Sequence, residues 1–446
     1  MFSDDDIEQL IQGTYKIDCA RIRLTNRGEP SRVYEGSGNI SFNEDEVLTA
    51  TIYHVFDENA PKPFSHLNSA PVSGKLFVED DYYSFEAISM SGRKWHSDNV
   101  LPNFGGIKIP SCGHVISVPL DKIFTISETQ NYTFPQGLSI IKGSYSLPWK
   151  TYKNRNEHTV LCVFDGEGDH LKWEIEDFDK KYIKVEQIYK TEINSVDSFD
   201  IFLEGLSIVC GAYLNSLASI HVTNHQVTST IYSHARRNIR KKSVASPFKL
   251  SLYGAQDCTL FLLNYCSKIK NVWEPFFVFW SRLASVNNLD FENACLVVGV
   301  AIESLMDEWH KGMAIRSSFD KQELTQLTEH IKAQLPYKSF LRGRLLNYLQ
   351  QPQRLSIAKK LKNLKNYGVT VEMIEAWQSL RHKSTHGVRI LDSELHHQDV
   401  QNVLDDFYRC LALFYKLLFL QIGYSGNHHD FSLSGWPYTS NPAPDL

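Results

Sequence analysis

The sequence predicts an α+β protein of more than one domain, in which a β-rich N-terminal domain precedes an all-α helical bundle. Three observations predict this: a length of 446 residues, short strand-like runs in the first half, and helical spacing of apolar residues in the second. Hydrophobic residues make up 42% and charged residues 22%, a globular composition that excludes a fibrous or wholly disordered chain. We expect a β-rich domain over residues 1–200, a junction over 201–250 and a helical domain over 251–446.

The two halves of the sequence carry opposite net charge. Residues 1–200 contain 20 Lys and Arg and 31 Asp and Glu, a net charge of −11, whereas residues 201–446 contain 26 and 20, a net charge of +6. A surface that binds nucleic acid needs positive charge. The second half is therefore the better candidate for such a surface, and the acidic first half is expected to repel RNA.

Runs of β-branched and aromatic residues, bounded by turn-forming residues, predict strands in the first half. Thr159–Phe164 and Leu171–Ile175 flank an Asp-Gly-Glu-Gly-Asp turn and predict a hairpin. The recurrence of turn residues favours a sandwich or a rolled sheet. The other predicted strands are Lys16–Leu24, Val47–Phe56, Gly74–Val78, Tyr83–Met90, His114–Leu120 and Leu138–Lys142.

Helical spacing dominates after residue 200. Phe199–Ile220 is an apolar run of helix length, and His221–Ile231 favours a brief return to strand. The two most strongly apolar helices are predicted over Phe291–Trp309 and Asp399–Ile422, the second ending at Gly423 as a C-cap. We expect the end of the chain, rich in Gly and Pro, to be an extended tail. Shorter helices are predicted at Gln322–Leu335, Phe340–Leu349, Leu355–Leu364 and Val371–Lys383.

Several classes of protein and site are set aside on composition and spacing. The start is acidic and no apolar run approaches about 18 residues, so we expect no secretory signal and no membrane span. The eight cysteines are scattered without a CxxC pair, which favours free thiols in a reducing cytoplasm. Asp165–Glu176 mimics part of a calcium loop but has His170 where the loop requires Gly. No His or Cys pair has metal-ligand spacing, so neither a metal nor another cofactor is expected.

Arg381 and His386 are separated by four residues at the expected end of the Val371–Lys383 helix. Arginine offers phosphate a fork of donors, and histidine exchanges a proton near neutral pH, so the pair is a minimal set for metal-free phosphodiester cleavage. On an ideal helix the two side chains would lie about 140° apart. Gly387 allows the helix to end there, so that His386 can turn toward Arg381. A solvated basic helix end has the same spacing and remains the alternative.

These two residues lie in a helical module, after the Ala301–Leu305 helix segment and before a long apolar helix that ends at Gly423–Gly426. The arrangement resembles the HEPN superfamily of ribonucleases, and within it the ApeA-type anti-phage proteins, which place a β-rich domain before such a module. The resemblance implies that Arg381 and His386 are catalytic and that Glu303 supports them. Glu303 sits on a largely apolar helix face and needs a partner if buried, and Arg381 is the expected one. The alternative for Glu303 is an exposed acid at the core edge.

The resemblance implies a metal-independent endoribonuclease, acting on tRNA or another structured RNA, with a toxin-like role in abortive infection. The ribose 2′-OH attacks the adjacent phosphorus and leaves a cyclic phosphate and a free 5′-OH, with His386 as general acid or base and Arg381 stabilising phosphoryl charge. A homodimer through the helical domain is also expected, for two reasons. One Arg–His pair offers too little charge for a reacting phosphate, which a composite cleft doubles, and the two long apolar helices have more nonpolar surface than one small bundle readily buries. The β-rich half is then expected to sense a phage-derived trigger and to restrain the nuclease.

Two lysine- and arginine-rich segments are candidates for RNA contact, although an ordinary solvated face is the alternative for each. Arg236–Lys242 is a dense cationic run near the junction, and its alternative is an exposed interdomain loop. The second segment is Lys359–Lys365, just before the helix that carries Arg381, and Tyr367 follows it closely enough to stack on a base of the bound RNA. The candidate RNA-binding residues of the helical domain are Lys359, Lys360, Lys362, Lys365 and Lys383.

Two further functions remain open. The first is a non-catalytic, dimeric helical interaction protein, in which Arg381 and His386 are incidental. The second is binding of a carbohydrate or small ligand by the β-rich half, which only its aromatic content favours.

Overall fold

A computed structural model describes residues 2–440 with internal gaps. Contacts divide the chain into two compact units. Unit 1 comprises residues 1–203, 214–241 and 250–252, and unit 2 comprises 204–213, 242–249 and 253–446. The gaps are residues 29–30, 55–77, 103–107, 110–112, 129–136, 143–144, 146, 148–151, 154–158, 166–170, 179–181, 190–196, 224–225, 234–242, 287–290, 310–320, 337–338, 351–355 and 386–396.

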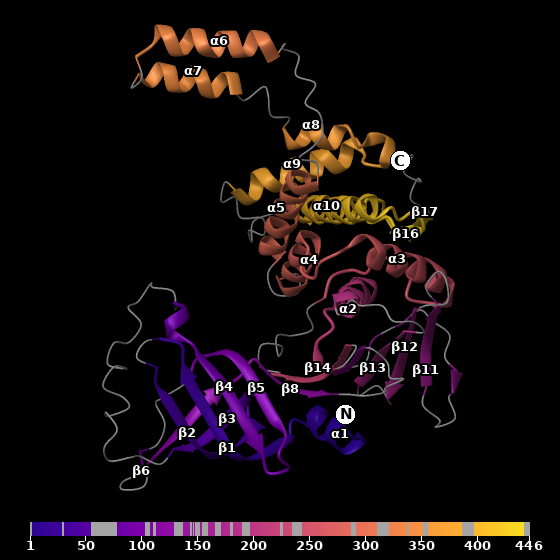
Figure 1. Ribbon diagram of the computed structural model, residues 1–446. Coiled ribbons are helices and arrows are strands. Elements are labelled where there is room, and N and C mark those ends of the chain that lie inside the picture. Colours follow the sequence, from indigo (N-terminus) through magenta and orange to yellow (C-terminus); the bar gives the residue numbers. More distant parts are fainter. Residues whose placement is uncertain are drawn as a thin grey trace. The chain divides into compact units, whose positions relative to one another are not determined.

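Unit 1 is built on one antiparallel sheet, to which 15 of the described strands belong (Figure 1). The strand order is β10-β11-β12-β13-β9-β14-β15-β8-β5-β4-β1-β2-β3-β7-β6, and a capped helix, α1 (Asp4–Gln12), precedes the sheet. The strands are β1 Lys16–Asn26, β2 Val33–Phe42, β3 Leu48–His54, β4 Tyr83–Ser89, β5 Lys94–Val100, β6 Lys108–Ile109, β7 Gly113–Pro119, β8 Lys122–Glu128, β9 Gly137–Lys142, β10 Tyr152–Lys153, β11 Thr159–Asp165, β12 Leu171–Phe178, β13 Tyr182–Tyr189, β14 Ser216–Thr223 and β15 Gln226–Tyr232.

Buried and outward-facing residues alternate along β1, and this pattern shows how the sheet forms its core. Ile17, Cys19, Ile22 and Leu24 are buried, while the residues between them face outward. The pairing register with both neighbouring strands shifts after Cys19, which marks a bulge and keeps Ile22 on the inner face. The predicted hairpin is confirmed, since β11 pairs with β12 in antiparallel register. The predicted strand at Gly74–Val78 lies outside the described residues except for Val78.

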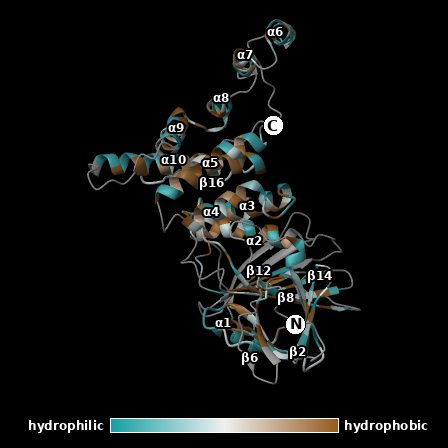
Figure 2. Ribbon diagram, turned by 90° about the vertical axis from the view of Figure 1, so that its left-hand side faces the viewer, coloured by the Kyte–Doolittle hydropathy of each residue, from teal (hydrophilic) through white to brown (hydrophobic). Residues whose placement is uncertain are grey.

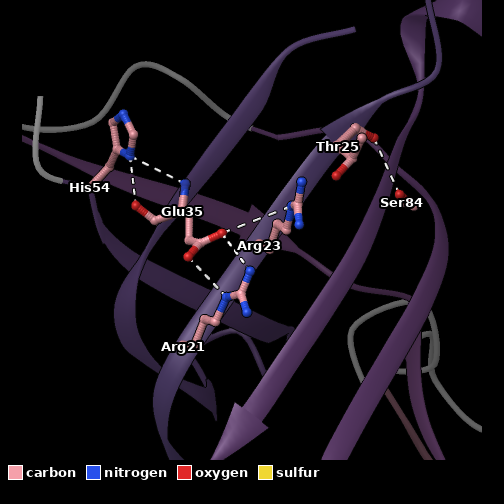
Figure 3. A network of polar contacts seen from close by, with 6 residues as sticks. All are labelled: Arg21, Arg23, Thr25, Glu35, His54 and Ser84. Carbon is pink, nitrogen blue, oxygen red and sulfur yellow. Dashed lines mark hydrogen bonds and ion pairs between the residues drawn. The ribbon is translucent and has the colours of Figure 1, made fainter. Parts of the chain in front are cut away.

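The outward face of β1, β2 and β3 carries a polar network in which charges compensate one another (Figure 3). Arg21 contacts Glu35 through two nitrogens, with Nε and Nη2 each 2.9 Å from a carboxylate oxygen. Arg23 Nε lies 3.9 Å from the same carboxylate, and His54 Nδ1 lies 2.7 Å from the Glu35 carbonyl oxygen. Because Glu35 pairs with both guanidinium groups, these two arginines do not form an isolated cationic patch for phosphate.

Unit 2 consists mainly of helices. Helix α2 (Asp197–Cys210) begins in unit 1 and ends in unit 2. The remaining helices are α3 Ala255–Lys268, α4 Pro275–Val286, α5 Phe291–Trp309, α6 Lys321–Gln334, α7 Phe340–Gln350, α8 Ile357–Lys362, α9 Val371–Thr385 and α10 His397–Ile422. Short 3₁₀ turns lie at η1 Glu79–Asp81 in unit 1, η3 Leu252–Gly254 and η5 Lys365–Tyr367, and a small hairpin pairs β16 Asn427–His429 with β17 Tyr438–Ser440.

Aromatic packing between α4 and α10 forms much of the core of unit 2. Phe276 stacks on Phe414 with ring centroids 4.3 Å apart, and Trp280 Nε1 donates to the Tyr415 hydroxyl at 3.2 Å. Figure 2 colours α5 largely brown, for hydrophobic residues, and its apolar stripe is buried. Among the described residues, none of the exposed large hydrophobics belongs to α5 or α10. The apolar excess from which a homodimer was expected is therefore absent from these two helices, and that part of the reasoning is wrong.

Two predicted elements differ in the structure. The helix over Phe199–Ile220 is wrong beyond Cys210, because Gly211 adopts a positive φ of 61° and the chain continues into β14. The predicted extended tail is instead partly ordered, since residues 427–440 form the β16–β17 hairpin. The C-cap is confirmed: Gly423 has φ 70°, and Tyr424 N donates to the Phe419 carbonyl at 2.8 Å. In the described part of the chain, no helix is both long and apolar enough to cross a bilayer.

Candidate active site

Helices α5 and α9 bring Glu303 and Arg381 together. The Nε of Arg381 lies 2.9 Å from Oε2 of Glu303, so the pairing expected from the sequence is present. The two side chains are 35% and 38% exposed, which leaves the pair accessible to a ligand. The printed contact is made by Nε of Arg381, and a guanidinium group is well suited to binding phosphate because its donors form a planar fork.

The position of Arg381 follows from the way α9 is built. Thr370 caps the helix, its hydroxyl accepting the Met373 backbone N–H at 3.3 Å. Met373, Trp377 and Leu380 are buried at helical spacing and fix the rotation of the helix about its axis. Arg381 directly follows Leu380, the last residue of this buried stripe, and lies at the edge of the core, where its guanidinium contacts the carboxylate of Glu303.

A stripe of residues on α5, spaced four apart, receives contacts from two other helices. Gly299 accepts a hydrogen bond from Trp377 Nε1 at 3.0 Å, and Glu303, one turn further, meets Arg381. Asp307, the next residue of the stripe, lies 2.5 Å from Lys360 of α8. Since Trp377 and Arg381 are also four residues apart, α5 and α9 meet in matching register. Two carboxylates of α5 thus hold one cation from α9 and one from α8.

The lysines expected to contact RNA differ in their surroundings. Lys360 is largely covered, with 15% of its side chain exposed, because it pairs with Asp307. Lys359, Lys362 and Lys365 are exposed on α8 and the turn after it, and Tyr367 is half-buried. These three exposed lysines can bind a phosphate without breaking an ion pair that the structure describes, whereas Lys360 would first have to separate from Asp307. The position of Lys383 within α9 is described, but its side chain is not.

His386 lies outside the described residues, as does Arg236–Lys242. The last described residue of α9 is Thr385, directly before His386, so Arg381 lies in the last turns of the described helix. His382, next to Arg381, is exposed. The local geometry therefore places Arg381 and Glu303 together and leaves the distance from either to the histidine undescribed.

Sequence reasoning missed the Asp307–Lys360 pair. The signal was present in the spacing of Glu303 and Asp307, which puts two carboxylates on one face of α5. It also missed two buried titratable groups that influence each other, Lys416 of α10 and His428 of β16. Burial, with the charge of Lys416 adding to it, lowers the pKa of His428 to about 4, and burial lowers the pKa of Lys416.

Among the residues that the structure describes, no group of three or more His, Cys, Asp or Glu side chains is arranged to hold a metal ion. Comparison with models of known protein families, with curated proteins and with solved structures found no match to this chain.

Proposed function

We propose that this chain is a metal-independent endoribonuclease of the HEPN type, acting on tRNA or another structured RNA in anti-phage defence by abortive infection. The observation that carries the proposal is the Arg381–Glu303 ion pair, in a helical unit, five residues before His386. An arginine that is oriented by a carboxylate and still accessible fits the task of binding a reacting phosphate. Glu303 is then a positioning residue, and Arg381 and His386 are the groups that meet the substrate.

The proposed reaction needs no oxidant, metal or cofactor. The 2′-oxygen loses its proton to a base and bonds to the adjacent phosphorus, while the bond from phosphorus to the 5′-oxygen breaks and that oxygen takes up a proton. The products are a 2′,3′-cyclic phosphate and a 5′-OH. His386 serves as the general acid or base, and Arg381 stabilises the charge on the phosphoryl oxygens. Lys359, Lys362, Lys365 and Lys383 bind flanking phosphates in this scheme.

Assembly and regulation complete the proposal. A homodimer through the helical domain doubles the positive charge around one phosphate, since each copy supplies an Arg381. The acidic β-rich half senses the phage-derived trigger and restrains the nuclease; its charge is unfavourable for RNA. The cytoplasm is the proposed location.

Substitution of the two catalytic residues tests the proposal. We expect His386→Ala and Arg381→Ala to lose RNA cleavage and any growth toxicity, with an unchanged thermal unfolding midpoint. His382→Ala is the matched control, because it removes an exposed imidazole one residue from Arg381 and should keep full activity. Undiminished cleavage by purified His386→Ala protein would rule out the assignment.

A non-catalytic interaction protein is the second candidate. Exposed hydrophobic side chains on α6 and α7 favour it, since they suit a protein partner. In that case Arg381 and Glu303 only join α9 to α5. Wild-type protein that binds a partner through these helices and leaves all RNA intact would select this candidate.

A further inference from the structure

Helices α6 and α7 form an antiparallel hairpin that leaves large hydrophobic side chains uncovered. Figure 1 shows the two helices side by side, and Arg342 of α7 donates to the Leu335 carbonyl at 3.2 Å, beyond the end of α6. On the inner side of the hairpin only Leu324 is fully buried among the described residues of the two helices. The uncovered side chains, with their exposed fractions, are Leu327 45%, Phe340 75%, Leu341 56%, Leu345 37% and Tyr348 70%.

The exposed residues of α7 form a continuous stripe. Leu341, Leu345 and Tyr348 are spaced four and three apart, the spacing of a seam between packed helices. Leu346 and Leu349 are half-buried and mark the side of α7 toward α6. At 100° per residue, that side lies about 110° round the helix from the centre of the exposed stripe. In a four-helix bundle each helix contacts two neighbours in directions about a right angle apart. Helix α7 has this geometry, and within the described part of the chain α6 is the one neighbour that packs against it.

The exposed leucine of α6 lies on the same side of the hairpin. Leu327 is about 60° round α6 from the buried Leu324, and the opposite directions of the two helices place it beside the stripe of α7. The hairpin therefore has one apolar face, which we call the hairpin face and define by Leu327, Leu341, Leu345 and Tyr348. Asn347, two residues after Leu345, is exposed and lies about 160° from it round α7 at 100° per residue.

Charge distinguishes the two edges of the hairpin face. Glu323 lies at its α6 edge and Arg344 at its α7 edge, where the guanidinium carbon is 4.7 Å from the Phe340 ring centre. A two-fold axis parallel to the helices would lay α6 of one copy over α7 of the other. That arrangement places the acidic edge of each copy against the basic edge of its partner, and the apolar residues meet between them.

We infer that the hairpin face docks on the same face of a second copy of this chain and completes a four-helix bundle. The inference rests on the proposed function for the expectation of a homodimer, but it requires no nuclease activity. RNA is the less suitable occupant because the centre of the face is leucine, Arg342 is engaged within the hairpin, and Arg344 stacks on Phe340.

Light scattering of the full-length chain tests the inference. We expect the wild type to be a dimer at about 50 μM, the range in which a micromolar dissociation constant gives mostly dimer. Leu345→Glu should raise the dissociation constant at least about 100-fold, because it buries an unpaired charge in the interface. Asn347→Glu adds the same charge on the opposite side of the same helix and should remain a dimer.

A cross-linking experiment tests the arrangement of the helices. Chains carrying Leu327→Cys are mixed with chains carrying Leu345→Cys and oxidised, and the peptides are identified by mass spectrometry. We expect a disulfide between position 327 of one chain and position 345 of the other. A monomeric wild type, a Leu345→Glu protein that stays dimeric, or absence of this cross-link would overturn the inference. Loss of RNA binding by Leu345→Glu with an unchanged dimer would overturn it in favour of RNA. None of these results depends on RNA cleavage.

Discussion

Arg381 and Glu303 meet one helical turn after Trp377 and Gly299 meet, along the same two helices. The indole of Trp377 is 7% exposed, whereas Arg381 and Glu303 are about one-third exposed, so the contact between α5 and α9 passes from core to surface within one turn. This places a charged pair at the edge of a packed core. The carboxylate can hold the guanidinium in one orientation because the backbones beneath it are fixed by packing.

Glu303 is expected to act on RNA cleavage through the orientation of Arg381. Glu303→Gln keeps an acceptor for Arg381 Nε but removes the negative charge. We expect kcat to fall about tenfold to a hundredfold, equal to about 1.4–2.7 kcal/mol of transition-state stabilisation. Single-turnover cleavage measures this, with Glu375→Gln on the exposed side of α9 as the control. A purely structural Glu303 would lower the unfolding midpoint and leave the cleavage rate of the folded fraction unchanged.

Lys359 and Lys360 are neighbours with different expected roles. Lys359→Gln should weaken RNA binding and reduce the slope of log affinity against log salt by about 0.7–0.9, the contribution of one phosphate. Lys360→Met should leave that slope unchanged and cost about 1 kcal/mol of folding stability, because Lys360 is largely covered and paired with Asp307. Filter binding at several salt concentrations, together with chemical denaturation, separates the two. Equal salt slopes for Lys359→Gln and the wild type would remove Lys359 from the RNA surface.

His428 is expected to make unit 2 sensitive to acid. Its folded pKa, about 4, lies below the ordinary value of 6.5, so the unfolded chain binds the proton more readily. The stability this group confers is therefore complete above about pH 6.5 and is lost as the pH falls toward 4. A shift of this size corresponds to about 3 kcal/mol. Urea denaturation at a series of pH values should show this loss, and His428→Phe should reduce it. An equal acid-dependent loss in both proteins would contradict the prediction.

A fragment of residues 201–446 should fold poorly. It carries β14 and β15 without β9 and β8, their pairing partners in the sheet of unit 1. Ala218 and Ile231 are fully buried in the intact chain and would become exposed, together with unpaired strand edges. We expect the fragment to aggregate in gel filtration, whereas the full chain elutes as a defined species. A monodisperse fragment would mean that unit 2 tolerates the loss of the sheet.

The sequence predicted some elements closely and others not at all, for identifiable reasons. Helix α5 was predicted with its observed bounds, because its apolar stripe repeats over 19 residues. The first part of β14 was missed since Phe199–Ile220 is one apolar run, and a buried strand within it has no period that separates it from a helix. The strand predicted over His221–Ile231 is confirmed by the end of β14 and most of β15. At the site, the Arg381–Glu303 contact could be anticipated because a carboxylate on an apolar helix needs a partner. For Asp307, the spacing from Glu303 places it on the same face of α5, but its partner Lys360 could not be predicted, since that contact depends on how α8 docks on α5.

The chemistry of the RNA ends tests the central claim most directly. Purified wild-type protein is incubated with tRNA in excess EDTA, and the ends of the products are identified by mass spectrometry and by their susceptibility to end-specific kinases and ligases. The proposed mechanism predicts a 2′,3′-cyclic phosphate and a 5′-OH, absent with Arg381→Ala and His386→Ala. A 5′-phosphate with a 3′-OH, or cleavage that EDTA abolishes, would contradict the account.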